Sequence, residues 1–214
     1  MFFLPGAFEP VDLSYRDPGV PEISEINDWL AAQEAEVPQL RDNAHKRVVW
    51  AGEPGAKTPL SVIYVHGFSA SSEELRPVPD ALAEALGANL HFTRLSGHGR
   101  DSAAMAQFTV RDLADDLAQA LAVGRTIGER VIVVGTSMGG ALSSLAALDP
   151  EYGTDIAGLA LFAPAFRIPA PGRQFMAMPY VRHWGPYVMG KTRSFIPAND
   201  AQAAAWTYSY PLVS

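Results

Sequence analysis

Residues 131–139 read Val-Ile-Val-Val-Gly-Thr-Ser-Met-Gly, and this stretch decides the fold class. Its first four residues form an apolar, β-branched run, which predicts a strand buried on both faces. Gly135, Ser137 and Gly139 then give the spacing Gly-x-Ser-x-Gly where the strand would turn into a helix. A Ser in such a turn projects clear of the sheet from a strained backbone, and the small residues beside it let strand and helix approach. The helix N-terminus beneath the hydroxyl favours negative charge, so Ser137 is the candidate nucleophile.

Strand-like and helix-like segments alternate on both sides of this turn. Expected strands lie at residues 45–51, 60–65, 89–95, 131–134 and 157–162. Expected helices lie at residues 24–36 with Ser24 as N-cap, at 79–86, from 109 onward, and at 141–148. Thr109 would begin the third of these helices, with Asp112 completing a variant of the capping box. Apolar strands that alternate with helices predict an α/β fold, with a mostly parallel sheet and helices on both faces.

A second motif, His66-Gly67-Phe68, follows the apolar strand at 60–65. An enzyme that transfers acyl groups needs two N–H donors aimed at the oxyanion. One would come from Met138, the residue after the nucleophile, and the other from Phe68. Gly67 would allow the backbone to turn inward. The alternative interpretation is a plain strand-terminating glycine.

A third motif, Ser96-Gly97-His98-Gly99, follows the strand at 89–95. It would form a loop at the same edge of the sheet and shape the floor of the site. For His98 itself, a hydrogen bond to backbone is a simpler interpretation than direct catalysis.

In this order and spacing, the three motifs resemble those of the α/β-hydrolase fold, and more closely the monoglyceride-lipase and carboxylesterase branch of serine hydrolases. The resemblance covers residues 44–164 as the hydrolase core and, more loosely, 165–214 as a cap, which leaves 1–43 as an N-terminal arm and helix. It implies cleavage of carboxylic esters through an acyl-enzyme, with no metal or organic cofactor. The implied nucleophile is Ser137, with oxyanion donors at Phe68 and Met138. The residues that would shape the site are His66, Gly67, His98, Gly135 and Gly139.

The sequence departs from this pattern after the nucleophile. The fold places its catalytic residues in the order Ser, then Asp or Glu, then His. Asp149 and Asp155 follow the nucleophile helix at the wrong edge of the sheet, and His183 lies within the expected cap. We therefore expect the triad acid and His beyond residue 214, in a longer protein or on a second chain that completes the sheet; the alternative is an unusual truncated homologue. Without those parts, the strand at 157–162 would be an exposed apolar sheet edge.

Composition limits the remaining classes of protein. The 214 residues are 48% apolar and 18% charged, which predicts one globular domain with a sizeable core. The absence of Cys excludes disulfides, zinc–thiolate sites and a Cys nucleophile. A net charge of −7 argues against a nucleic-acid partner.

The sequence shows neither a membrane span nor a signal peptide. No apolar stretch reaches the roughly 18 residues of a membrane span, and residues 1–6 lack the basic region of a signal peptide. We expect a cytoplasmic protein, or a periplasmic or membrane-anchored one if an N-terminal leader is missing from this sequence.

The segment 165–214 differs from the rest of the chain. It carries five basic residues and one acidic residue, and it is rich in aromatic residues and Met. Such a segment would wall an apolar acyl pocket, so the leading hypothesis is a serine hydrolase of small lipid-like or medium-acyl esters. Its positive charge could favour an anionic membrane surface, but solvated charge is the simpler interpretation.

Two alternatives remain. One is an amide, thioester or C–C hydrolase, because the same turn and loop serve those reactions. The other is a catalytically silent, truncated hydrolase-like domain that binds a ligand or partner through its apolar cleft and bare sheet edge. Acyl and alcohol specificity and oligomeric state are not specified by the sequence.

Overall fold

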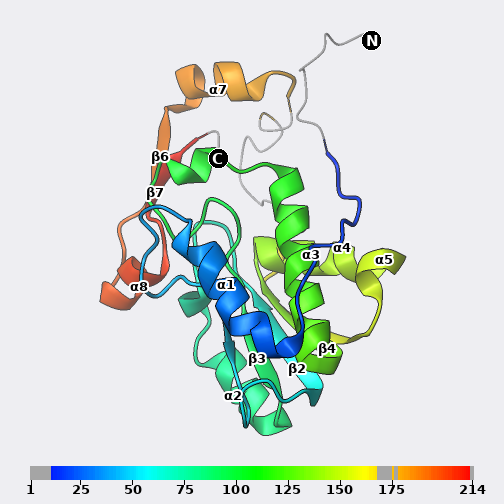
Figure 1. Ribbon diagram of the computed structural model, residues 1–214. Helices are drawn as coiled ribbons and strands as arrows, with labels where there is room; N and C mark the ends of the chain where they lie inside the picture. Colours follow the sequence, from blue (N-terminus) through cyan, green and yellow to red (C-terminus); the bar gives the residue numbers. More distant parts are fainter. Residues whose placement is uncertain (1–10, 168–174, 176–177, 213–214) are drawn as a thin grey trace.

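The central sheet holds five strands in the order β1-β3-β2-β4-β5 (Figure 1). The computed structural model describes residues 11–167, 175 and 178–212. Strands β3, β2, β4 and β5 are parallel to one another, whereas β1 is antiparallel to β3. The strands are β1 (Arg47–Val49), β2 (Thr58–Val65), β3 (Asn89–Phe92), β4 (Gly128–Thr136) and β5 (Ile156–Phe162). This is the mostly parallel sheet that the alternating pattern predicts.

Strands β2 and β4 form the middle of the sheet because they are apolar on both faces. All side chains of β2 from Ser61 to Val65 are buried. In the register of the two strands, Val62 lies opposite Ile132 and Val65 lies opposite Gly135. The loops that follow β2 and β4 therefore leave the sheet side by side at the same edge.

Helices cover both faces of the sheet (Figure 1). Helices α3 and α4 pack on one face, against β2, β4 and β5, and α2 packs on the other face, against β2 and β3. The helices and 3₁₀ turns are η1 (Ile23–Glu25), α1 (Ile26–Ala35), η2 (Ser72–Glu74), α2 (Val78–Leu86), η3 (Ala104–Ala106), α3 (Val110–Ile127), α4 (Met138–Leu148), α5 (Pro150–Gly153), α7 (Val181–Met189) and α8 (Asp200–Ala205).

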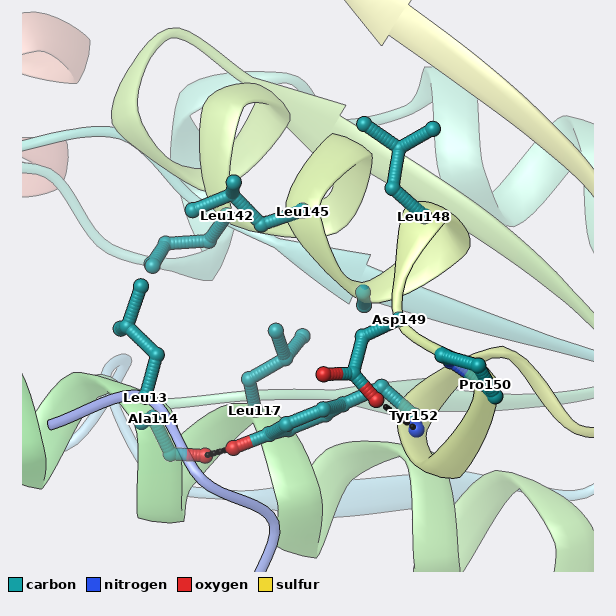
Figure 2. Close-up of a pocket in the computed structure, with 10 residues that line it drawn as sticks. Leu13, Ala114, Leu117, Leu142, Leu145, Leu148, Asp149, Pro150 and Tyr152 are labelled. Atoms are coloured by element: carbon teal, nitrogen blue, oxygen red, sulfur yellow. Dashed lines mark hydrogen bonds between the residues drawn. The ribbon is translucent and has the colours of Figure 1, made fainter.

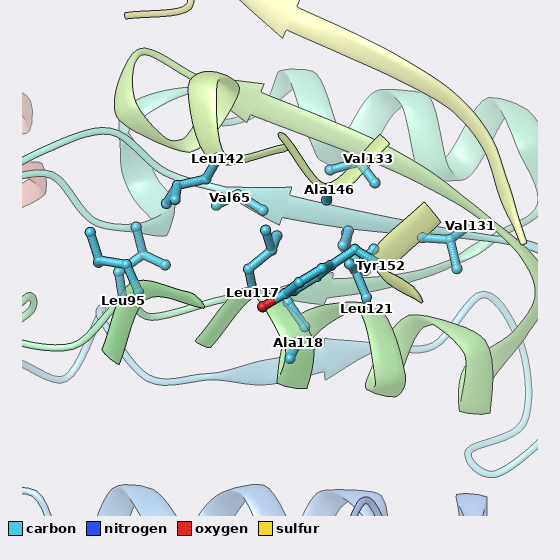
Figure 3. Packing of buried hydrophobic residues seen from close by; sticks show 13 residues of the cluster. Val65, Leu95, Leu117, Ala118, Leu121, Val131, Val133, Leu142, Ala146 and Tyr152 are labelled. Atoms are coloured by element: carbon cyan, nitrogen blue, oxygen red, sulfur yellow. The ribbon is translucent and has the colours of Figure 1, made fainter. Parts of the chain in front are cut away.

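A hydrophobic core fills the space between α3, α4 and the sheet (Figure 3). Leu117 and Leu121 of α3 pack against β4, where Val131 and Val133 are fully buried. Tyr152 of α5 closes one side, and its hydroxyl donates to the carbonyl of Ala114 at 3.4 Å. Burial of these side chains stabilises the packing of α4 on the sheet, at about 25 cal/mol per Å² of apolar surface removed from water.

Helix α3 begins as the sequence predicts. The Thr109 hydroxyl accepts a hydrogen bond from the Asp112 N–H at 3.2 Å, and the Asp112 carboxylate accepts one from the Thr109 N–H at 2.7 Å. This reciprocal pair is the capping box.

Helix α1 begins differently from the prediction. Ser24 lies inside η1, and the residue that precedes α1 is Glu25, whose side chain makes no capping bond. The carbonyl of Glu22 accepts the Glu25 N–H, and the carbonyl of Ile23 accepts the Ile26 N–H at the start of α1. The 3₁₀ turn therefore replaces a side-chain cap.

The region after β5 contains more regular structure than the prediction had. Strands β6 (Thr192–Ser194) and β7 (Ser209–Pro211) pair antiparallel in a small sheet of their own. The sequence pattern missed them because each strand has three residues and no apolar run. Residues 168–174, 176–177 and 213–214 of the expected cap, and the first ten residues of the expected N-terminal arm, lie outside the described residues.

Strand β5 forms one edge of the central sheet, and the sequence analysis expects an edge strand at residues 157–162. Its residues are partly exposed, and Phe162 at its end retains 37% of its surface. No helix in the described parts of the chain combines the length and apolar character that crossing a bilayer requires.

Candidate active site

Ser137 occupies a strained turn between β4 and α4. Its backbone angles are φ 50° and ψ −113°, a region that L-residues rarely adopt. Its N–H donates to the carbonyl of Phe162 at 2.9 Å, and its carbonyl accepts from the N–H of Ala165 at 2.8 Å. The last residue of β5 and the segment that follows it therefore hold both backbone polar groups of Ser137. The turn places Ser137 directly after β4, at the N-terminus of α4, where its side chain makes no capping hydrogen bond.

The two glycines of the motif are required by close backbone approaches. A Cβ at Gly139 would collide with the carbonyl oxygens of Val65 and His66, the latter at 2.5 Å. A Cβ at Gly135 would lie 2.8 Å from both the Gly140 Cα and the Ser143 Oγ. Gly139 lets the first turn of α4 rest directly on the end of β2, and Gly135 lets the same helix lie close to the end of β4.

The loop after β2 reaches Ser137. A Cβ at Gly67 would lie 3.2 Å from the Ser137 Cβ, so this loop and Ser137 are in contact range. The N–H groups of Phe68 and Met138, the predicted oxyanion donors, make no hydrogen bond to any described residue. The sequence-predicted residues of both motifs thus come together at one edge of the sheet.

His66 and His98 hold the loops around the site. His66 accepts the Leu95 N–H at 3.0 Å and contacts the Gly67 carbonyl at 2.9 Å. His98 accepts the Ser69 N–H at 3.0 Å and contacts the Ser96 carbonyl at 2.9 Å. Burial lowers the pKa of His66 to about 3 and that of His98 to about 4, so both rings are neutral near pH 7. For His98, the hydrogen bonds to backbone agree with the simpler of the two interpretations of the sequence.

The side chain of Phe68 belongs to an aromatic cluster beside the loop that follows β2. Its ring lies 5.0 Å from that of Tyr210 on β7 and 6.4 Å from that of Phe108. The N–H of Thr207 also donates to the carbonyl of Ser69 at 2.6 Å. The segment before β7 therefore packs on the loop after β2.

No hydrogen bond among the described residues joins the Ser137 hydroxyl to a histidine. His91 is buried in β3 with its Nδ1 3.1 Å from the Arg47 carbonyl, and His183 is exposed on α7. Asp149 caps α5, where it accepts the Glu151 N–H at 2.8 Å. Within the described ranges, no group of three or more acidic or His side chains is arranged to hold a metal ion.

Glu74 is a site residue that the sequence analysis missed. Its carboxylate, at the end of η2, accepts the Gly67 N–H at 2.7 Å. Burial raises its pKa to about 7, although the Gly67 amide and the Tyr64 hydroxyl act in the opposite direction. In the sequence, Glu74 is adjacent to Glu73, and nothing in the residue pattern distinguishes the buried carboxylate from its ion-paired neighbour.

A separate cavity of about 290 Å³ lies between α3, α4, α5 and the N-terminal segment (Figure 2). Leu142, Leu145 and Leu148 line it from the later turns of α4, and Leu13 lies across from them. Ser137 is not part of its lining. The cavity is therefore distinct from the site at the N-terminus of α4.

Known proteins resemble this chain at the level of sequence and of structure. The sequence profile of a family described as serine aminopeptidase S33 matches residues 56–211. The thermostable monoacylglycerol lipase of Bacillus sp. strain H-257 is 32% identical over 112 residues, which are 52% of this chain and 43% of that protein. A structure reported for LipS and LipT, two metagenome-derived lipolytic enzymes, matches with a TM-score of 0.64 at 23% identity, over 82% of this chain and 66% of that chain.

A monoacylglycerol lipase of Paleococcus ferrophilus matches with a TM-score of 0.49 at 16% identity, over 78% of this chain and 65% of that chain. The chain thus spans less than two thirds of the length of these three relatives.

Proposed function

The chain belongs to the serine aminopeptidase S33 family of α/β-hydrolases, and from this membership we propose that it cleaves carboxylic esters with Ser137 as nucleophile. The observation that carries the proposal is the strained backbone of Ser137 at the N-terminus of α4, with Gly67 packed against it. A serine with this strained backbone lowers the stability of the fold, and residues strained in this way cluster at active sites. The lipolytic relatives support an ester as the substrate.

In the proposed reaction, the Ser137 hydroxyl attacks the ester carbonyl and loses its proton to a base. The N–H groups of Phe68 and Met138 donate to the oxyanion that forms, and the N-terminus of α4 adds its dipole. The alcohol then leaves with a proton, and water releases the acid from the acyl-enzyme. The base and its orienting acid are assigned to none of the described residues.

The proposed substrates are lipid-like or medium-acyl esters. The rings of Phe68, Phe108 and Tyr210 form an apolar wall beside the proposed oxyanion donor. An acyl chain that packed on this wall would bury apolar surface without leaving polar groups unpaired.

Amide hydrolysis is the second candidate, because the matching family is described as a serine aminopeptidase. The same nucleophile and oxyanion donors serve both bonds. Turnover of an ester and an amide with the same acyl group distinguishes the two, and faster amide turnover would favour the second candidate.

The test is covalent labelling by a fluorophosphonate together with turnover of a p-nitrophenyl ester. Ser137→Ala is the test variant, and Ser144→Ala is the matched control. Ser144 lies on the helix that Ser137 begins, and its hydroxyl donates a hydrogen bond to the Gly140 carbonyl. We expect one adduct in the wild type and the control, none in Ser137→Ala, and a loss of turnover of roughly 10³-fold or more in that variant. Unchanged turnover in Ser137→Ala contradicts the proposal, and no adduct in any form indicates a catalytically silent domain.

A further inference from the structure

Glu74 connects three segments of the site. Its carboxylate accepts the Gly67 N–H at 2.7 Å and contacts the hydroxyl of Tyr64, which reaches it from β2. The same hydroxyl lies 3.1 Å from the Oγ1 of Thr136, the residue directly before Ser137. The carboxylate is thus bonded to the loop that carries Phe68 and is connected, through Tyr64 and Thr136, to the residue directly before Ser137.

Gly67 separates the carboxylate from the nucleophile. A Cβ at this position would lie 2.9 Å from the Glu74 Oε1 and 3.2 Å from the Ser137 Cβ. Glu74 and Ser137 therefore border the same small space, which is open only because residue 67 has no side chain.

The charged groups around η2 are mostly paired with one another. Arg47 of β1 and Arg76 both bond Glu73, and Arg76 also bonds Asp80. Helix α8 packs against η2, and its Asp200 is exposed. In the loop after β2, burial lowers the pKa of His66 to about 3, so its ring is neutral near pH 7. Among the described residues, the carboxylate of Glu74 forms no ion pair with these groups, and burial raises its pKa to about 7.

We propose that Glu74 is a positioning residue for Ser137: it holds the Gly67 peptide and hence the Phe68 oxyanion donor, and its negative charge lowers the reactivity of Ser137. This inference rests on the proposed function. The reaction creates an oxyanion beside the space that Glu74 borders, and a carboxylate there repels it. A protonated Glu74 still accepts the Gly67 N–H through its carbonyl oxygen but carries no charge. The site is therefore most reactive, for a given state of its base, when Glu74 is neutral.

The first experiment follows the Gly67 amide by ¹H–¹⁵N NMR between pH 5 and 9. We expect its signal to titrate with a midpoint near 7 in the wild type and not to titrate in Glu74→Gln. Glu73→Gln is the matched control, because Glu73 is adjacent, carries the same charge and is bonded to Arg47 and Arg76. A Gly67 titration that persists unchanged in folded Glu74→Gln overturns the inference, whether or not the chain is catalytically active.

The second experiment measures the rate of fluorophosphonate labelling of Ser137 over the same pH range. The rate for Glu74→Gln divided by that for the wild type removes any pH dependence that the base imposes on both. We expect this ratio to rise roughly tenfold from pH 5.5 to 8.5, because only the wild type gains a charge beside the oxyanion. The ratio for Glu73→Gln should stay flat.

Glu74→Leu removes the acceptor as well as the charge, so its labelling should be slower than that of Glu74→Gln at every pH. A flat ratio for Glu74→Gln overturns the inference. If the wild type is not labelled at all, the proposed function fails for this chain, and the NMR titration still decides the role of Glu74.

Discussion

The carboxylate of Glu34 accepts two hydrogen bonds from Arg94, one from Nε and one from Nη2, each of 2.8 Å. Glu34 lies in the last turn of α1, and Arg94 lies two residues after β3, directly before the loop that carries His98. Their side chains are 2% and 10% exposed. Burial opposes ionisation of Glu34, but Arg94 and the N–H of Lys46 outweigh it and lower its pKa. The N-terminal helix is therefore bonded to a loop at the edge of the sheet that carries the site.

Removal of Glu34 should strongly destabilise the fold. Glu34→Ala leaves Arg94 buried without its partner, and breaking a buried pair from one side costs about 3–5 kcal/mol. Urea unfolding at pH 7 measures this difference. The control is Glu129→Ala, because the Lys57–Glu129 pair is exposed, with an N–O distance of 3.6 Å, and such pairs contribute about 0–1 kcal/mol. Equal losses in the two variants would show that the pair with Arg94 has no special structural role.

Gly139→Ala should destabilise the fold and abolish labelling of Ser137. The new methyl group would overlap the carbonyl oxygens of Val65 and His66, so α4 must move away from β2. We expect a loss of roughly 2 kcal/mol or more, since close-packed backbone cannot yield at low cost. Gly158→Ala is the matched control, because a Cβ on this residue of β5 meets no atom within 4 Å. Thermal unfolding and fluorophosphonate labelling measure both effects, and normal labelling of Gly139→Ala would contradict the prediction.

The backbone of the site is more predictable from the sequence than its side-chain partners. The strand β4 and the strained turn at Ser137 depend on local sterics, and the apolar run and the Gly-x-Ser-x-Gly spacing of one short stretch predict both. The Thr109–Asp112 capping box is local in the same way, since its partners are three residues apart. These features were therefore predicted at the correct residues.

The interactions that the sequence could not show depend on how the chain folds back on itself. Glu34 and Arg94 are 60 residues apart, and each alone resembles a solvated charge on a surface. Ser24 was wrongly predicted as an N-cap because residue type alone does not show that a 3₁₀ turn satisfies the N–H groups at the start of α1. Glu74 was missed although Gly67 is only seven residues away, because the residue pattern does not show which of Glu73 and Glu74 turns back toward the end of β2.

The protein should lose stability as the pH falls below about 6.5, the ordinary pKa of histidine. Burial lowers the pKa of His66 to about 3 and those of His91 and His98 to about 4 in the folded chain. The unfolded chain therefore binds protons that the folded chain does not, and each ring contributes a slope of about 1.4 kcal/mol per pH unit between its two pKa values. Stability from these rings is complete above pH 6.5 and declines toward pH 4.

His98→Gln should reduce this slope by the contribution of one ring. Urea midpoints between pH 4.5 and 7.5 measure the difference, with His183→Gln as control because His183 is exposed on α7. A slope that His98→Gln leaves unchanged would show that His98 binds protons equally well in both states.

Ser137→Gly should stabilise the fold while it removes the reactivity. At φ 50° and ψ −113°, a serine is strained, whereas glycine adopts the mirror image of the β region without penalty. Relief of this strain is worth about 1–3 kcal/mol, reduced by the greater backbone freedom of glycine in the unfolded chain. We therefore expect a net gain of roughly 1 kcal/mol in urea unfolding.

Two controls isolate the strain from other effects of the substitution. Ser137→Ala keeps a Cβ in the strained turn, so it should lose the fluorophosphonate adduct without the gain in stability. Ser144→Gly makes the same change on the same helix at an ordinary helical position, where we expect a loss of roughly 0.5–1 kcal/mol and normal labelling. A Ser137→Gly variant that is less stable than Ser137→Ala would show that the turn stores no strain, and it would remove the observation on which we propose Ser137 as the nucleophile.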